Sequence, residues 1–100
     1  MSATKYLPLF HPGEILLEEF VKPMGLTLAS VSRATGIPPS RLTEITKGRR
    51  SLTAETALRL ARFFGTSAAF WLGLQTEHDL EVAERAVGKK VAREVTTLTT

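Results

Sequence analysis

The sequence predicts an all-α protein built from five helices in a single domain. Two observations support this prediction. Apolar residues recur at spacings of three and four along most of the chain, and each such run lies between residues that are typical of helix starts and ends. The 100 residues include 43% hydrophobic residues and no cysteine, so the chain is long and apolar enough to bury a core without disulfides.

The first helix is expected to begin at Pro12 and to stop before Pro23. Proline is tolerated at the first helical position, and Glu14 in the first turn favours the positive end of the helix dipole. The apolar residues at helical spacing are Ile15, Leu16 and Phe20, extended by Val21 and Met24. This helix is predicted to be scaffold.

Two short helices follow, with only a few residues between them. Thr27 is a typical N-cap for the second helix, and Gly36 is a natural left-handed residue at its end. The third helix is expected over residues 39–47, opened by a proline, with Leu42 and Ile45 facing inward. Two short helices joined by a tight glycine-containing turn are typical of the helix-turn-helix motif, whose second helix enters the major groove of DNA.

Two further helices complete the predicted fold. Thr53 is a suitable N-cap for the fourth helix, and Gly65 closes it. Ser67 caps the fifth helix, whose apolar residues continue as far as Gly88. No segment before this point alternates in the way that a strand requires.

The residues after Gly88 allow two interpretations. Residues 89–94 can be helical, whereas the β-branched run at 95–97 favours extended structure, so we expect this part of the chain to be frayed or dependent on a partner. The predicted organisation is an N-terminal arm at 1–11, a helix-turn-helix domain at 12–87 and a C-terminal tail at 88–100.

The positive charge is concentrated in the middle third of the chain. Residues 33–62 contain seven basic and two acidic residues, a net charge of +5, whereas the segments before and after them each carry −1. A clustered basic segment is typical of a surface that binds a polyanion, because released counterions supply much of the affinity. On charge alone, a solvated helical face without any partner is an equal alternative.

The candidate DNA-binding residues lie on and around the third helix. Because Leu42 and Ile45 are expected to face inward, side chains on the outer face can reach base edges. The predicted base-facing residues are Ser40, Arg41, Thr43 and Glu44. The predicted phosphate-binding residues, at helix starts or on the turn after the third helix, are Thr27, Lys47, Arg49, Arg50 and Thr53.

Two of these residues have competing roles. Arg41 is the leading base reader, because its guanidinium can bond both acceptors of a guanine edge. A phosphate contact or a solvated surface position is its alternative. Glu44 can accept a hydrogen bond from a cytosine amino group, but we favour its orienting Arg41 or Lys47 across one helical turn.

Three strings of residues resemble a known family. They are HPGEILLEEFVKPMGLT, GRRSLTAETALRLARFFGTS after the tight turn, and FWLGLQTEHDLEVAE, and they lie within residues 11–84. On these strings the chain resembles the HigA-type antitoxins, also called the VapI family, within the Xre or lambda-repressor-like helix-turn-helix group.

The resemblance implies a homodimer that binds double-stranded DNA at an operator in its own promoter, where it represses its own operon. It also implies a partner, a HigB-type ribonuclease toxin that cleaves messenger RNA and is neutralised by the antitoxin. Subunit pairing is implied for the fifth helix, with candidate contacts at Phe70, Trp71, Leu74 and Leu80. A two-fold dimer predicts an inverted-repeat operator.

The chain departs from the usual helix-turn-helix pattern where the recognition helix begins. Polar residues are common at those positions, but this chain has Pro38 and Pro39. The two prolines remove one side-chain cap and two backbone donors. Base reading is therefore expected to rest mainly on Ser40, Arg41 and Thr43.

Other functions compete with this interpretation. A free-standing Xre-type regulator without a toxin is one, and a protein-interaction module that does not bind DNA is another. An enzyme is disfavoured, since the only suggestive cluster surrounds His78 and Glu81, for which a polar helix exterior is favoured over a metal site. No metal or cofactor is expected. Without a long apolar run or a secretory N-terminus, the chain is expected to be cytoplasmic and to avoid membranes.

Overall fold

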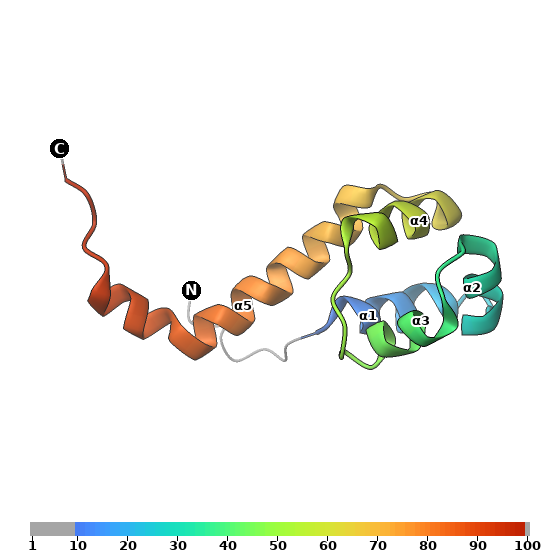
Figure 1. The fold of residues 1–100 in the computed structure, drawn as a ribbon, viewed down its shortest axis with the longest axis horizontal. Coiled ribbons are helices and arrows are strands. Elements are labelled where there is room, and N and C mark those ends of the chain that lie inside the picture. Colours follow the sequence, from blue (N-terminus) through green and yellow to red (C-terminus); the bar gives the residue numbers. More distant parts are fainter. Residues whose placement is uncertain (1–9, 100) are drawn as a thin grey trace.

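The structure is a computed structural model that describes residues 10–99. Most of the predicted arm, residues 1–9, lies outside the described part of the chain. The described residues form five helices, the first of which consists of two continuous parts, α1 and η2 (Figure 1). The elements are α1 (Pro12–Ile15), η2 (Leu16–Val21), α2 (Leu28–Thr35), α3 (Pro39–Thr46), α4 (Ala54–Phe64) and α5 (Ala68–Glu94).

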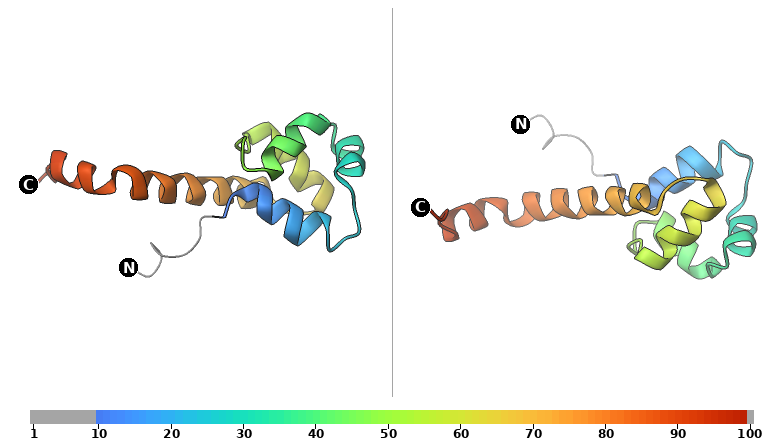
Figure 2. Two further views of the ribbon diagram at one scale, coloured as in Figure 1. Left: turned by 90° about the horizontal axis from the view of Figure 1, so that it is seen from below. Right: turned by 90° about the horizontal axis from the view of Figure 1, so that it is seen from above.

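The helices from α1 to α4 form a compact group, and α5 projects from it. The first part of α5 packs against α4 and α1, whereas its C-terminal part extends away from the other helices (Figure 2). The described residues consequently span 52 × 28 × 22 Å. The predicted all-α, five-helix fold is confirmed, including the N-caps at Thr27, Thr53 and Ser67.

The second part of the first helix, η2, is a π-helix. Its wider turn forms hydrogen bonds five residues apart, as in the bond from the Lys22 N–H to the Leu17 carbonyl at 3.0 Å. The wider turn allows Leu16 and Val21, which lie five residues apart, to be buried on the same side. Met24, which was predicted to extend this apolar face, is 55% exposed because it lies in the turn after the helix has ended.

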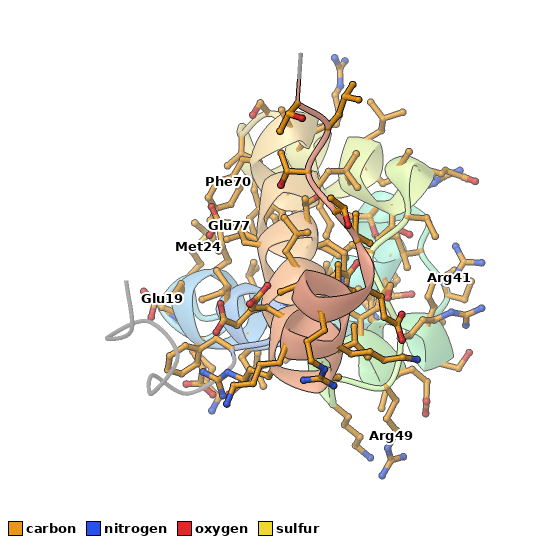
Figure 3. All side chains as sticks on the ribbon, turned by 90° about the vertical axis from the view of Figure 1, so that its left-hand side faces the viewer. Glu19, Met24, Arg41, Arg49, Phe70 and Glu77 are labelled. Atoms are coloured by element: carbon orange, nitrogen blue, oxygen red, sulfur yellow. The ribbon has the colours of Figure 1, made fainter. Side chains whose placement is uncertain are left out.

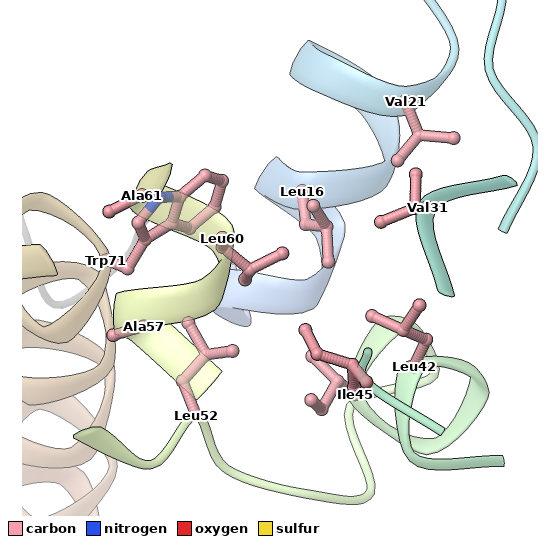
Figure 4. Packing of buried hydrophobic residues seen from close by; sticks show 11 residues of the cluster. Leu16, Val21, Val31, Leu42, Ile45, Leu52, Ala57, Leu60, Ala61 and Trp71 are labelled. Carbon is pink, nitrogen blue, oxygen red and sulfur yellow. The ribbon is translucent and has the colours of Figure 1, made fainter. Parts of the chain in front are cut away.

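The core lies where the five helices meet, and each contributes apolar side chains (Figure 4). Trp71 is its largest fully buried residue, and the indole N–H donates to the Thr66 hydroxyl at 2.7 Å. Phe20 lies with its ring centroid 4.9 Å from that of Trp71 and 5.1 Å from that of Phe64. The larger fully buried aliphatic residues around them are Leu16, Val31, Ile37, Leu42, Ile45 and Leu60.

The start of α1 lies in very close contact with the end of α3. A side chain at Gly13 would overlap the backbone carbonyl of Ile45 and approach the Cα of Thr46. Glycine is therefore required here by space and not by backbone conformation. The contact fixes the C-terminal end of α3 against the first helix.

The fifth helix extends beyond Gly88, the residue at which its apolar pattern was expected to stop. It continues through Gly88 and ends at Glu94, so the helical interpretation of residues 89–94 is the one the structure takes. A glycine inside a helix costs only about 1 kcal/mol relative to alanine, which good helix formers on both sides offset. Val95 is extended, as the β-branched run predicts. The division of the chain at residue 88 stays a prediction and does not coincide with a helix end.

The contact at Gly13 leads to a first prediction. Gly13→Ala places a methyl group on the Ile45 carbonyl and is expected to lower the free energy of unfolding by about 1–3 kcal/mol, in the range of other overpacked sites. Urea unfolding followed by circular dichroism measures the change. Gly73→Ala is the matched control, because a Cβ there meets nothing within 4 Å. The control should be neutral or stabilising, and equal losses in both variants would contradict the prediction.

Candidate nucleic-acid interface

The helix-turn-helix consists of α2, a short turn and α3. Thr27 begins α2 with a capping box, in which its hydroxyl accepts from the Ser30 N–H at 3.0 Å and the Ser30 hydroxyl accepts from the Thr27 N–H at 3.1 Å. Gly36 ends α2 with a φ of 77°, the left-handed conformation predicted for it. Ile37 then turns into the core, and α3 starts two residues later.

Hydrogen bonds within the chain hold this turn in one shape. The Ser32 hydroxyl donates to the Ile37 carbonyl at 2.6 Å, and the Thr35 hydroxyl accepts from the Ile37 N–H at 3.2 Å. Arg59 on α4 donates through Nη1 to the Thr35 carbonyl at 2.9 Å and pairs with Glu55 at 3.0 Å. These roles could not be predicted from the sequence, because buried hydroxyls and a bridging arginine look like ordinary polar residues there.

The orientation of α3 follows from its two buried residues. Leu42 and Ile45 are fully buried, as predicted, so the opposite side of the helix faces outward. Among the outward residues, Ser40 is exposed and Arg41 is partly exposed. Thr43 and Glu44 are also partly exposed on α3, and Lys47 is exposed just after it. The structure thus leaves each of the four predicted base-facing side chains partly or fully accessible to a ligand.

The start of α3 has no side-chain cap. Pro38 occupies the N-cap position and Pro39 the first helical position, and no side chain bonds the first turn. The sequence-based expectation of a missing cap agrees with this arrangement. Pro39 itself lacks one of the N–H groups that a helix start normally leaves unpaired, which reduces the need for a cap.

The predicted phosphate-binding cations follow α3 on an exposed turn. Gly48 has a φ of 75° and turns the chain back, so that the Arg49 N–H donates to the Glu44 carbonyl at 2.9 Å. The Arg49 guanidinium also lies 3.8 Å from the Glu44 carboxylate. Glu44 was expected to orient Arg41 or Lys47. It pairs with Arg49 instead, because the turn at Gly48 brings Arg49 back beside Glu44. Lys47 and Arg50 are exposed.

The two threonines predicted to bind phosphate use their hydroxyls as helix caps. Thr27 accepts from Ser30, and Thr53 accepts from the Thr56 N–H at 3.3 Å at the start of α4. Their hydroxyls are therefore engaged within the chain. An anion can therefore be bound at these positions only by the remaining backbone N–H groups in the first turn of each helix.

Two arginines of the basic segment lie on the opposite side of the molecule from two acidic and two apolar side chains. Seen along α5, Arg41 and Arg49 lie on one side, whereas Glu19, Phe70 and Glu77 lie on the other, together with Met24 (Figure 3). Arg41 and Arg49 thus lie away from Glu19 and Glu77, whereas Glu44 lies among the basic side chains and pairs with Arg49. The side that carries these arginines attracts a polyanion and gives it one preferred orientation.

The four predicted dimer contacts have different surroundings. Trp71 is fully buried within the chain, so it presents no surface to another subunit. Leu74 is partly buried against the core, and Phe70 is 39% exposed. Leu80 is 65% exposed. Of the four residues, Phe70 and Leu80 are therefore the ones accessible to a second subunit.

His11 and His78 meet beside the end of α3. The Nδ1 atom of His11 accepts from the Gly13 N–H at 2.9 Å and caps α1. The ring of His78 lies edge-on to that of His11 at a centroid distance of 4.9 Å. Burial lowers the pKa of His11, and His78 lowers it further, against opposing effects of Glu14 and Asp79.

The His78 and Glu81 pair considered as a metal site is not brought together with further ligands. His78 lies 3.2 Å from the Phe10 carbonyl, and Glu81 pairs with Arg85 at 3.1 Å. Among residues 10–99, no three His, Cys, Asp or Glu side chains gather closely enough to hold a metal ion. Within the same residues, no helix has the length and apolarity needed to cross a membrane.

Comparison with known proteins places this geometry in a family. The sequence profile of the helix-turn-helix family HTH_3 matches residues 17–71, which include α2, the turn and α3. The chain belongs to this family. The family comprises helix-turn-helix regulators and antitoxins and not enzymes.

The relatives of this helix-turn-helix protein include antitoxins. Virulence-associated protein I of Dichelobacter nodosus is 51% identical over 79 residues, which are 79% of this chain and 73% of that protein. An addiction module antidote protein of the HigA family from Coxiella burnetii is 44% identical, with a TM-score of 0.87 over 92% of this chain and 100% of that chain. Pseudomonas aeruginosa antitoxin HigA, solved with the higBA promoter, is 37% identical, with a TM-score of 0.88 and the same two coverages. The resemblance to HigA- and VapI-type proteins is confirmed.

The cap at His11 predicts a pH-dependent stability. Because the pKa of His11 in the folded chain lies below its ordinary value of 6.5, the unfolded chain takes up the proton first as the pH falls. The contribution of His11 to stability is therefore fully present above pH 6.5 and decreases as the pH falls below it. Urea unfolding between pH 8 and pH 5 should show this loss.

His11→Asn is the control for this experiment. Asparagine keeps a capping oxygen but does not titrate, so the loss of stability on acidification should be smaller in the variant. A variant that loses as much stability as the natural chain would assign the effect to other groups.

Proposed function

We propose that this protein is a DNA-binding antitoxin that represses its own toxin–antitoxin operon and neutralises a messenger-RNA-cleaving toxin. The observation that carries the proposal is the exposed polar face of α3 beside the basic turn after it, held on a buried helix-turn-helix corner. A relative of the same fold, Pseudomonas aeruginosa HigA, was solved with its promoter, which supports the same use of this surface.

DNA recognition divides between two sets of side chains. Arg41 bonds a guanine edge in the major groove, and Ser40 and Thr43 contact neighbouring bases. Lys47, Arg49 and Arg50, with the helix starts at Thr27 and Thr53, hold the phosphates on either side. The exposed ion pair between Arg49 and Glu44 contributes about 0–1 kcal/mol, so a phosphate can replace Glu44 as the partner of Arg49.

The active unit is a homodimer. Two recognition helices on a two-fold axis require two half-sites about 34 Å apart, one turn of DNA, and hence an inverted repeat in the operator. The fifth helix supplies the pairing surface, through its exposed residues and not through Trp71. The support for this step is the long projecting α5.

Toxin neutralisation rests on the relatives alone. Their names include an antidote protein of the HigA family and antitoxin HigA. The partner proposed for this chain is a HigB-type ribonuclease encoded beside it. A mobility-shift assay on the upstream DNA of the gene, with and without the product of the adjacent gene, tests both parts. A shift without any effect of the neighbour's product would favour a free-standing regulator, and no shift would favour a protein-interaction module.

The division of roles on α3 gives a further prediction. Arg41→Ala should lose discrimination at one base pair, about 1–3 kcal/mol, while binding to random DNA changes little. Lys47→Ala should weaken binding to all sequences and reduce the salt dependence by about one counterion. Fluorescence anisotropy on operator and random duplexes at several salt concentrations measures both effects.

Lys22→Ala serves as the control for loss of a positive charge, since Lys22 pairs with Glu18 at 2.8 Å in the turn after η2, outside the proposed DNA face. It should leave both affinities unchanged. If Arg41→Ala weakened operator and random DNA equally, Arg41 would be a phosphate contact.

A further inference from the structure

Both histidines of the chain meet at one place, although one precedes α1 and the other lies on α5. Their ring centroids are 4.9 Å apart, and the ring of His11 is largely buried. The same ring lies against the turn after α3, because a Cβ added at Gly48 would be 3.7 Å from it. We call His11, Gly13, Gly48 and His78 the histidine junction. It joins the start of α1, the turn after α3 and α5.

The hydrogen bonds of the two rings differ in how they respond to a proton. His11 Nδ1 accepts from the Gly13 N–H at 2.9 Å, so this nitrogen carries no proton. His78 Nδ1 lies 3.2 Å from the Phe10 carbonyl, which can only accept, so this nitrogen carries one. A proton added to His78 goes to its other nitrogen and leaves the bond to Phe10 in place. A proton added to His11 goes to Nδ1 and removes the bond to Gly13.

The bond between His11 and Gly13 supports the end of the recognition helix. It is a buried bond, and its loss would leave a buried N–H facing a second donor. Gly13 is also the residue whose backbone touches the end of α3, and α1 packs against both α3 and α5 (Figure 2). The turn at Gly48, on which the His11 ring lies, is flanked by the exposed cations Lys47 and Arg49. Rotation of a charged His11 ring away from Gly13 would therefore remove support from the turn that carries these cations.

The groups around His11 keep it neutral at neutral pH. Burial is the main cause that lowers the pKa of His11, and His78 on α5 lowers it further. Glu14 on α1 and Asp79 on α5 act in the opposite direction and are outweighed. The turn after α3 contributes Gly48, which has no charge and is flanked by two exposed cations. Because the pKa of His11 lies below its ordinary value of 6.5, the junction is closed above pH 6.5 and opens as the pH falls below it.

We propose that the histidine junction makes operator binding sensitive to protons: protonation of His11 separates the start of α1 from the turn at Gly48 and weakens the contact of that turn with DNA. The inference rests on the proposed function, because it adds a regulator to the DNA-binding surface. Histidine suits this role, since its charge changes near neutral pH. The sign of the effect is diagnostic. Added positive charge by itself tightens binding to a polyanion, whereas the junction weakens operator binding as the pH falls.

The junction is tested first on the full chain without DNA, by NMR between pH 8 and pH 5. The ring signals of the two histidines are followed together with the backbone amide signals of Gly13 and Gly48. Both amide signals should shift with the same midpoint as the ring of His11. Gly65 is the matched control, because it ends α4 with a φ of 73°, close to the 75° of Gly48, and its amide should not shift. Amides at Gly13 and Gly48 that do not follow the His11 ring would overturn the proposal.

The effect on DNA is measured by fluorescence anisotropy on the upstream DNA of the gene at pH 8 and pH 5, at one salt concentration. The natural chain should lose about fivefold in affinity, the order of magnitude expected for loss of a helix cap. His11→Asn keeps a capping oxygen but does not titrate, so its affinity should stay the same or rise on acidification. Circular dichroism at pH 5 should show that both proteins remain helical. An equal loss of affinity in His11→Asn, or a loss that accompanies unfolding, would overturn the proposal.

The contribution of His78 is tested by removing its charge. His78→Phe keeps an aromatic ring beside His11, and the midpoint of the His11 ring signal should move to higher pH, because a positive neighbour is lost. The loss of operator affinity should move in the same direction. Lys22→Ala, which removes a positive charge from the turn after η2, is the control and should leave the midpoint unchanged. An unchanged midpoint in His78→Phe would overturn the assignment of His78 to the junction.

Failure of this inference is distinguishable from failure of the proposed function. If the Gly48 amide follows the His11 ring but the chain binds the upstream DNA at neither pH, the junction responds to protons and the DNA-binding function is wrong. If the chain binds that DNA equally well at both pH values, the function stands and the inference is overturned. If binding weakens on acidification in the natural chain and not in His11→Asn, both stand.

Discussion

The placement of the recognition helix depends on one close backbone contact. Gly13 brings the start of α1 against the Ile45 carbonyl, and no larger residue fits in that space. His11 caps the same helix start, and a side chain added at Gly48 would lie 3.7 Å from its ring. Leu42 and Ile45 then bury the inner side of α3. The outward direction of Arg41 therefore follows from contacts that Arg41 itself does not make.

Much of this arrangement could be predicted from local sequence signals. Thr27, Thr53 and Ser67 are N-caps, and Gly36 adopts the left-handed conformation, because these residue types satisfy or permit what helix ends require. Leu42 and Ile45 are buried because their spacing on a short helix leaves only one apolar side. The base-facing set followed from those two residues. The DNA-binding role of that set stays a proposal.

The features that escaped prediction depend on contacts between distant segments. The π-helical turn in η2 lets both Leu16 and Val21 reach the core, whereas a regular helical pattern does not indicate such widening. Trp71 looked like an interface residue, but its hydrogen bond to Thr66 and the contact of its ring with the tilted ring of Phe20 place it inside the fold. The Arg59 bond to the Thr35 carbonyl crosses 24 residues, a separation at which no local pattern gives a signal.

The bridging role of Arg59 determines how far the proposed DNA-binding face can change without loss of the fold. The turn is shaped by Ser32, Thr35 and Arg59, and α3 is anchored by its buried residues, so the residues that maintain the fold are separate from those on the outer face. Substitutions at exposed positions usually change stability by about 0.5 kcal/mol or less. Ser40, which is exposed, can therefore be exchanged at little cost to folding, so the proposed base-reading face can change while the scaffold that presents it is kept.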